Sequence, residues 1–342
     1  EMTPVAIAPR TKAMIHDDFH LTLEQARNLS HHKGDLSLNA YASLSDEAAA
    51  CLARHREGTL WLNGLESLSV PAAAALASHE GTVALDGLKT LSPAAAVELA
   101  RLPHALTLDG LVTISDDAAA ALASHTGSLW LNGLSSVSNS AAIALGRHDG
   151  SLWLNGLESL SDEAAAGLAT LRGLLSLGGI RALSPAAAVA LGRHHGDLLL
   201  GGVTSLSDDT AAALGKHSGM LRLSGLTALS PLAARGLAQH SRALCLDGIT
   251  AMPEPLAESL AHHEGLLSLN GVTSVSSAAA ALLARHRGDL YLGGLATLDV
   301  DAARELVRHD SWLYLDGLTS VPTDVAAVLD TKQSLRIGLS RG

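Results

Sequence analysis

The sequence predicts an α/β solenoid, because one short pattern of residues returns every 23 positions along almost the whole chain. Residues 128–150 read SLWLNGLSSVSNSAAIALGRHDG, and residues 151–173 read SLWLNGLESLSDEAAAGLATLRG. A glycine after a short Leu-x-Leu stretch marks the repeat from Gly64 to Gly317 in equal steps of 23 residues. A period of this length is typical of solenoids, in which each repeat buries its apolar face only against its neighbours. We expect about 13–14 such repeats.

Each repeat begins with an alternation that predicts a short strand. In residues 60–62 (Leu-Trp-Leu) the two leucines are expected to point inward and the tryptophan outward. Asn63-Gly64 follows and predicts a tight turn in which the glycine has a positive φ. Aliphatic residues such as Leu65 then lead from the turn towards a helix.

The second half of each repeat carries the signals of a short helix. A serine stands where its hydroxyl can accept from a free N–H of the first turn, and a proline or two acidic residues often follow it. An alanine run and one leucine come next, and His-x-Gly closes the helix, with the glycine expected in the left-handed conformation. The expected N-cap serines are Ser45, Ser69, Ser92, Ser115, Ser138, Ser161, Ser184, Ser207, Ser230 and Ser276. The helix leucines are Leu29, Leu52, Leu76, Leu99, Leu122, Leu145, Leu168, Leu191, Leu214, Leu237, Leu260, Leu283, Leu306 and Leu329.

The repeat pattern also predicts the domain organisation. We expect an irregular lead-in at 1–12, a degenerate N-terminal capping repeat at 13–34, the solenoid at 35–337 and a tail at 338–342. In the capping repeat, residues 13–15 take the strand position, and Thr22 and Gln25 predict a capping box. An extra residue at 56–57 lengthens one turn. The start at Glu-Met suggests a trimmed N-terminus. Since the C-terminal tail is short and not very polar, we expect the sequence to stop within the array or just at its end.

Composition excludes some classes of function. The formal net charge is −11 and there is no block of Lys or Arg, which argues against nucleic acid and anionic membranes as partners. No apolar run approaches the roughly 20 residues that span a bilayer. Cys51 and Cys245 lie in distant repeats and are not expected to pair, which fits a reducing, cytoplasmic compartment.

At Leu-x-Leu-x-Gly-Leu-x-x-Leu, the chain resembles a bacterial leucine-rich repeat protein with a 23-residue repeat, of the planctomycete-type arrays rich in LSDEAAxALAxHxG. The resemblance covers residues 13–337. It implies a right-handed solenoid with a parallel sheet on the concave side, short helices on the outer side, and binding through the concave face. The family usually keeps Asn or Cys three residues after the second strand leucine, where its side chain bonds the backbone, but here that column is aliphatic, as at Leu65 and Leu88. A β-helix with three strands per turn is the main alternative fold, and the alanine-rich, capped segment argues against it.

Aromatic residues gather at the outward strand positions. All four tryptophans and two of the three tyrosines fall on a predicted strand or directly before one. Exposed aromatic side chains are typical anchors of protein interfaces, although they can also merely cover a sheet by stacking from strand to strand. The predicted partner-binding residues are Trp61, Trp130, Trp153, Arg222, Tyr291, Trp312 and Tyr314.

A histidine recurs at one position near the end of most repeats. Imidazole is a common metal ligand, but a single file of rings offers two ligands at most, and a metal site needs three or four. The favoured interpretation is a ring that caps the free carbonyls at a helix end. The column is His32, His55, His79, His125, His148, His194, His217, His240, His263, His286 and His309, with Leu102, Leu171 and Lys332 at the gaps.

These patterns favour a non-enzymatic scaffold that binds a protein on its concave sheet, with a glycan as the second choice of partner and no cofactor or metal. No unique nucleophile stands with a base, and aspartates such as Asp86 are interpreted as turn residues. Two alternatives remain open. One is a structural module that self-associates end to end, and the other is the targeting region of a larger enzyme or receptor.

Overall fold

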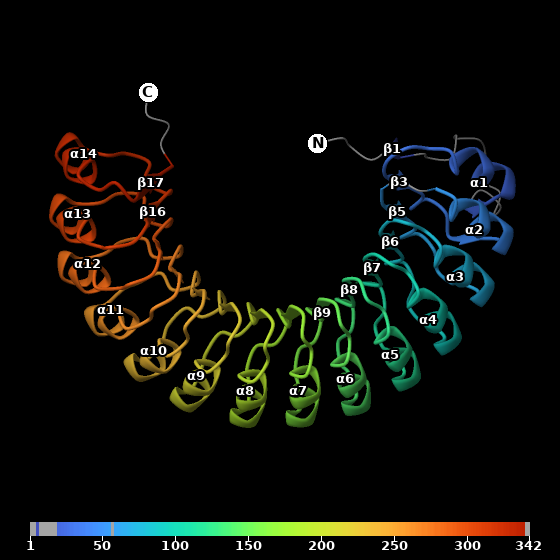
Figure 1. The fold of residues 1–342 in the computed structure, drawn as a ribbon, viewed down its shortest axis with the longest axis horizontal. Helices are drawn as coiled ribbons and strands as arrows, with labels where there is room; N and C mark the ends of the chain where they lie inside the picture. The colour runs from blue at the N-terminus through green and yellow to red at the C-terminus, as the bar shows by residue number, and fades with distance from the viewer. Residues whose placement is uncertain (1–4, 7–18, 56–57, 339–342) are drawn as a thin grey trace. The chain divides into compact units, whose positions relative to one another are not determined.

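In the computed structural model each repeat between residues 59 and 332 forms one strand of two or three residues and one helix of seven residues. The structure describes residues 5–6, 19–55 and 58–338. The chain forms two compact units, Glu1–Ser176 and Leu177–Gly342. Within each unit the strands line the inner side and the helices the outer side (Figure 1). The fold is therefore the predicted α/β solenoid, and the alternative of a β-helix with three strands per turn is wrong.

The first unit contains a parallel sheet whose strands follow the order of the chain, and β1 pairs with β3 at its edge. Its strands are β1 (Val5–Ala6), β3 (Leu36–Ser37), β5 (Leu60–Trp61), β6 (Val83–Ala84), β7 (Leu106–Thr107), β8 (Leu129–Trp130), β9 (Leu152–Trp153) and β10 (Leu175–Ser176), and a separate pair is β2 (His20–Leu21) with β4 (Ser43–Leu44). Its helices are α1 (Leu23–Leu29), α2 (Asp46–Leu52), α3 (Val70–Leu76), α4 (Pro93–Leu99), α5 (Asp116–Leu122), α6 (Asn139–Leu145) and α7 (Asp162–Leu168).

The second unit repeats the arrangement, again with parallel strands in chain order. Its strands are β11 (Leu198–Leu199), β12 (Leu221–Arg222), β13 (Leu244–Cys245), β14 (Leu267–Ser268), β15 (Leu290–Tyr291), β16 (Leu313–Leu315) and β17 (Leu335–Ile337). Its helices are α8 (Pro185–Leu191), α9 (Asp208–Leu214), α10 (Pro231–Leu237), α11 (Glu254–Leu260), α12 (Ser277–Leu283), α13 (Val300–Leu306) and α14 (Thr323–Leu329).

The strand register stacks equivalent residues of successive repeats. Leu129 pairs with Leu152 and Trp130 with Trp153, so each column of the repeat becomes a column in space. The inward strand leucines as far as β16 and the helix leucines from Leu52 onward are buried, which confirms the predicted core. Leu29 in α1 is only half-buried, because no complete repeat covers its other side in the described part of the chain.

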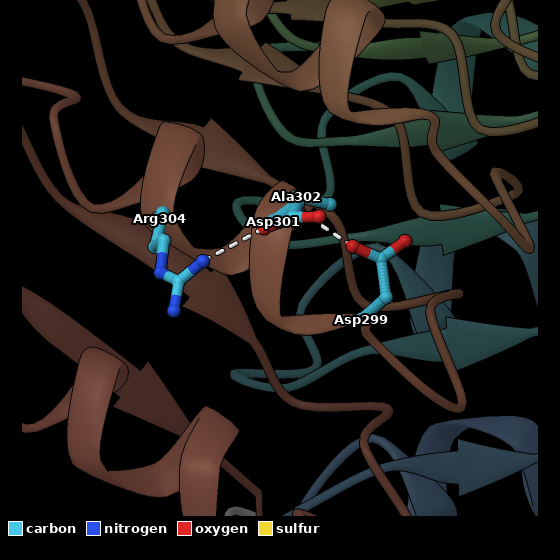
Figure 2. Close-up of polar contacts among 4 residues, drawn as sticks. All are labelled: Asp299, Asp301, Ala302 and Arg304. Carbon is cyan, nitrogen blue, oxygen red and sulfur yellow. Dashed lines mark hydrogen bonds and ion pairs between the residues drawn. The ribbon is translucent and has the colours of Figure 1, made fainter.

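The helix starts follow the sequence signals closely. Each predicted N-cap serine accepts a hydrogen bond from the backbone N–H three residues on, and Thr22 and Gln25 form the predicted capping box. In α13 an aspartate replaces the serine, and Asp299 accepts from the N–H of Ala302 at 2.7 Å (Figure 2). On the same helix Arg304 donates to Asp301 at 2.8 Å.

The glycines do not have the conformation that the sequence suggested. Among the described residues only Gly34 and Gly58 have a positive φ, so the predicted left-handed glycines of the turns and of the other helix ends are wrong. They are required for space instead. A Cβ atom on Gly87 would lie 2.4 Å from the carbonyl oxygen of Asn63 in the preceding repeat, and one on Gly81 would lie 2.0 Å from that of Gly58. The backbones of neighbouring repeats therefore touch at these points.

The N-terminal segment contains a strand that the sequence did not suggest. Val5–Ala6 lie in the expected irregular lead-in and form β1, which pairs in parallel with β3. Residues 13–15, the expected strand of the capping repeat, and the extra residue at 56–57 lie outside the described residues.

Candidate binding surface

In the first unit, two of the predicted site residues form a stacked pair on the strand side. Trp130 on β8 and Trp153 on β9 have ring centroids 4.3 Å apart and planes 12° apart. Both side chains are half-exposed. The alternation of each strand turns the rings away from the buried leucines, and the parallel register brings the rings together. The pair is a flat, partly exposed aromatic surface.

In the second unit, three predicted residues gather in the same way. Tyr291 and Tyr314 stack with centroids 3.9 Å apart, and Trp312 lies tilted against Tyr314 at 6.1 Å. Trp312 is 46% exposed. Burial, assisted by the Tyr314 hydroxyl, raises the pKa of Tyr291 to about 12, so this phenol stays neutral at physiological pH. Beside the cluster, Arg336 forms an ion pair with Asp316 at 3.2 Å.

Trp61 and Arg222 stand apart from these clusters. Trp61 is followed along its column by Ala84 and Thr107, and its indole nitrogen is buried without a hydrogen-bond partner. Arg222 is exposed and lies next to Cys245, which is 7% exposed. The outward column consists of the residues between the two leucines of each Leu-x-Leu stretch. Small residues in it, such as Ala84 and Cys245, face away from the core but are buried beside the larger Trp61 and Arg222. Burial raises the pKa of the Cys245 thiol, which makes it a poor nucleophile.

A ladder of Asn and Asp side chains runs along the edge of the first unit's sheet, and it is not among the features predicted from the sequence. The residue directly after each second strand leucine accepts a hydrogen bond from the backbone N–H of the equivalent residue one repeat later. The contacts are Asn39 to Asn63 at 2.9 Å, Asn63 to Asp86 at 3.0 Å, Asp86 to Asp109 at 2.9 Å, Asp109 to Asn132 at 2.8 Å and Asn132 to Asn155 at 3.0 Å. The signal was the recurrence of Asn or Asp before the glycine, which we interpreted as turn chemistry alone.

Substitution of Asn63 tests whether the ladder stabilises the fold. We expect Asn63→Leu to lower the free energy of unfolding by about 1–2 kcal/mol, because the part-buried N–H of Asp86 loses its acceptor. Asn63→Asp should change it by less than about 1 kcal/mol, because a carboxylate fills the same position at Asp86. Urea denaturation followed by circular dichroism measures both. Equal stability of the two variants would contradict a stabilising role for the ladder.

The histidine column forms stacked rings inside the protein rather than at its surface. Within the second unit the rings from His194 to His309 follow one another with centroids 5.6–5.9 Å apart and planes 5–13° apart. From His55 onward no ring of the column is more than 2% exposed. Shorter stacks occur in the first unit on either side of the leucine at position 102.

The polar contacts of these rings involve turn carbonyls as well as helix ends, so helix capping by the column stays a prediction. The Nε2–H of His240 donates to the carbonyl of Gly219, in the turn of the preceding repeat, at 2.7 Å. The backbone carbonyls of Met220 and Gly196 act on His217, and those of His263 and Gly265 act on His286, and in each case they favour the charged ring. For His125 and His309 the carbonyls that favour the charged ring include those of Ala100 and Ala284, which end the helices of the preceding repeats.

Burial lowers the pKa of eight histidines of the column, which are His79, His125, His148, His217, His240, His263, His286 and His309. The pKa falls to about 4 for His217 and for His286, first through burial and then through the neighbouring rings of the column. For His309 burial again acts first, followed by the charge of Lys332. His217 and His286 are therefore neutral at pH 7. Among the described residues no group of three or more His, Cys, Asp or Glu side chains is placed to hold a metal ion.

Comparison with known proteins identifies the fold alone. No family model matches the sequence, and no curated protein matches it. A solved structure that is similar is the complex of Toll with Spätzle from Drosophila, with a TM-score of 0.51 and 13% sequence identity. The match covers 88% of this chain and 46% of the Toll chain, so this chain spans less than half the length of that protein. The likeness agrees with a solenoid of the leucine-rich repeat type. Within the described residues, no helix has the length and apolar character needed to cross a bilayer.

Proposed function

We propose that this chain is a non-enzymatic scaffold that binds a partner protein on the strand side of its sheets. The observation that carries the proposal is the concentration of partly exposed aromatic rings there. In a chain with only 2% aromatic residues, all four tryptophans lie on this side. Large, rigid aromatic side chains supply much of the binding energy at protein interfaces.

Two further features support the proposal. The rings are held in place before any partner arrives, since they stack on one another and stand on hydrogen-bonded strands. Such preorganisation lowers the entropy cost of binding. The similar structure from Drosophila is also that of a solenoid protein in complex with another protein.

The test is to replace the stacked pair by Trp130→Ala with Trp153→Ala. We expect the double variant to lose more than about 2 kcal/mol of binding free energy towards a partner captured with the parent chain. Stability should fall by no more than about 1.5 kcal/mol, the scale of a stacked aromatic pair. Titration calorimetry measures the binding, and thermal melting by circular dichroism measures the stability.

The matched control is Val97→Ala with Ile143→Ala on the helix side of the same unit. These side chains are 48% and 44% exposed, so the control also removes apolar surface without opening the core. It should leave binding unchanged. A large loss of stability in the tryptophan variant, with binding intact, would show that the rings only cover the sheet.

A second candidate function is end-to-end self-association. β17 is the last strand of its sheet in the described part of the chain, and Leu335 and Ile337 on it are only half-buried. An open strand edge can pair with another chain. Size-exclusion chromatography with light scattering distinguishes a monomeric scaffold from a concentration-dependent assembly.

The finer assignments are also proposals. We propose that the array is of the 23-residue bacterial type that the sequence resembles, and that it works in a reducing compartment, where Cys51 and Cys245 stay free thiols. We further propose that residues 13–34 act as the N-terminal capping repeat. The half-burial of Leu29, in contrast to the full burial of Leu52, supports that role.

A further inference from the structure

The strand side of the first unit is acidic as well as aromatic. Three columns of this unit reach that side: the residues before, within and after each Leu-x-Leu stretch from position 35 to 176. Among the described residues these columns contain three tryptophans and three aspartates, but neither lysine nor arginine. Three residues after the last of these columns, the turns contain Glu66, Lys89 and Glu158, which add one net negative charge. The second unit differs, since Arg222 and Arg336 stand in its central column.

Two of these aspartates are fixed between the aromatic residues. Asp86 and Asp109 follow β6 and β7, the strands that separate Trp61 from Trp130. One oxygen of Asp86 accepts from the N–H of Asp109 at 2.9 Å, and Asp109 accepts from the N–H and side-chain amide of Asn132 at 2.8 and 3.1 Å. Neither carboxylate has a cationic partner among the described residues. The ladder thus presents two uncompensated negative charges at defined positions.

The chemistry of this surface fits a cation on an extended chain. Indole rings attract Lys and Arg head groups through their faces, and the alkyl stems pack against the rings. Strands are about 4.8 Å apart, so Trp61 and Trp130, three strands apart, are separated by about 14 Å along the sheet. Alternate side chains of an extended segment are about 6.8 Å apart. A segment lying across the strands can therefore place residues i and i+4 over the two tryptophans and residue i+2 near the aspartates.

We propose that the strand side of the first unit binds an extended, basic segment of a partner protein. The basic character of the bound segment follows from charge complementarity. An aromatic surface with fixed carboxylates that lack a cationic partner favours Lys and Arg over neutral or acidic side chains. The overall charge of −11 adds long-range attraction for a basic partner. This inference rests on the proposed function and adds the chemical class of the partner.

The experiment measures binding of two short synthetic peptides, one of alternating lysine and serine and one of alternating glutamate and serine. Calorimetry or tryptophan fluorescence with the full chain reports the affinity. The lysine peptide should bind, more weakly as salt is raised, and the glutamate peptide should not. Asp86→Asn with Asp109→Asn should weaken the lysine peptide about five- to tenfold. Asparagine already fills the ladder at Asn63 and Asn132, so this variant keeps the backbone hydrogen bonds of the ladder and loses only the contact from the Asn132 side-chain amide to Asp109. Its melting temperature should therefore stay close to that of the parent chain.

The matched control is Asp117→Asn with Glu163→Gln, which removes the same charge from exposed residues on the helix side. It should leave the peptide affinity unchanged. Equal binding of both peptides, no binding of the lysine peptide, or equal weakening by the control would each overturn the basic-segment inference. If a captured partner depends on Trp130 and Trp153 but not on Asp86 and Asp109, the proposed function holds and this inference fails. If no captured partner depends on the tryptophans, both fail.

Discussion

Replacing Leu145 by Asp is expected to remove more than about 4 kcal/mol from the free energy of unfolding. Leu145 is the last residue of α6, and its side chain is 0% exposed. α6 lies between α5 and α7 of the first unit, so stacked repeats bury Leu145 from both sides. A carboxylate there has neither water nor a cation, and a buried unpaired charge is among the most destabilising changes known. Urea denaturation monitored by circular dichroism gives the loss directly.

The same substitution at Leu29 is the matched control. Leu29 occupies the equivalent position in α1 but is only half-buried, so the new carboxylate can reach water. We expect a loss below about 2 kcal/mol, since an end repeat can also fray without unfolding the rest. If both variants unfolded like the parent chain, the repeat register would be wrong. If both lost the same large free energy, the proposed capping role of residues 13–34 would be wrong.

Acidification is expected to destabilise the second unit through its histidine column. His217 and His286 have a pKa near 4 in the folded protein and near 6.5 in the unfolded chain. The unfolded state therefore binds more protons between these values, and stability falls as the pH drops through this window. At pH 5 each of these two rings costs on the order of 2 kcal/mol.

The surroundings of these rings explain the direction of the shift. His217 faces His194 and His240, which lower its pKa, and only the backbone carbonyls of Met220 and Gly196 raise it. His286 lies between His263 and His309 in the same way. The carbonyls of a helix end would favour the charged ring by about 0.3–1 kcal/mol. This is smaller than the cost of burying a charge beside other rings.

Hydrogen exchange at about pH 7.5 and about pH 5 tests the prediction. The amides between residues 194 and 309 should lose protection at the lower pH. The matched variant is His217→Leu with His286→Leu, because leucine already fills this column at Leu102 and Leu171, where it is 1% exposed. That variant should keep its stability at neutral pH and lose much of its acid sensitivity. Equal or better protection of the parent chain at pH 5 would contradict the neutral column.

The local signals in the sequence determined the elements of this fold. Ser138 predicts the start of α6 because its hydroxyl satisfies an N–H of the first turn, which depends only on residues three positions away. The alternation at 60–62 predicts β5 for the same local reason. The period of 23 residues places these elements in register, so the stacking of Trp130 on Trp153 follows from the pattern and a parallel sheet. These parts of the candidate surface could be predicted.

Only the tertiary structure decided the roles that depend on the next repeat. Gly87 does not have a positive φ, so backbone conformation does not require a glycine there. A glycine is required because the carbonyl of Asn63 in the preceding repeat leaves no room for a Cβ atom. Asn63 itself is a ladder acceptor for Asp86, although the local pattern suggested a turn. The histidines are buried and stacked, although their local position suggested a helix cap. The sequence by itself determined what each residue does within its own repeat, because those interactions span a few residues. Contacts between repeats depend on how closely the backbones approach, and packing sets that distance.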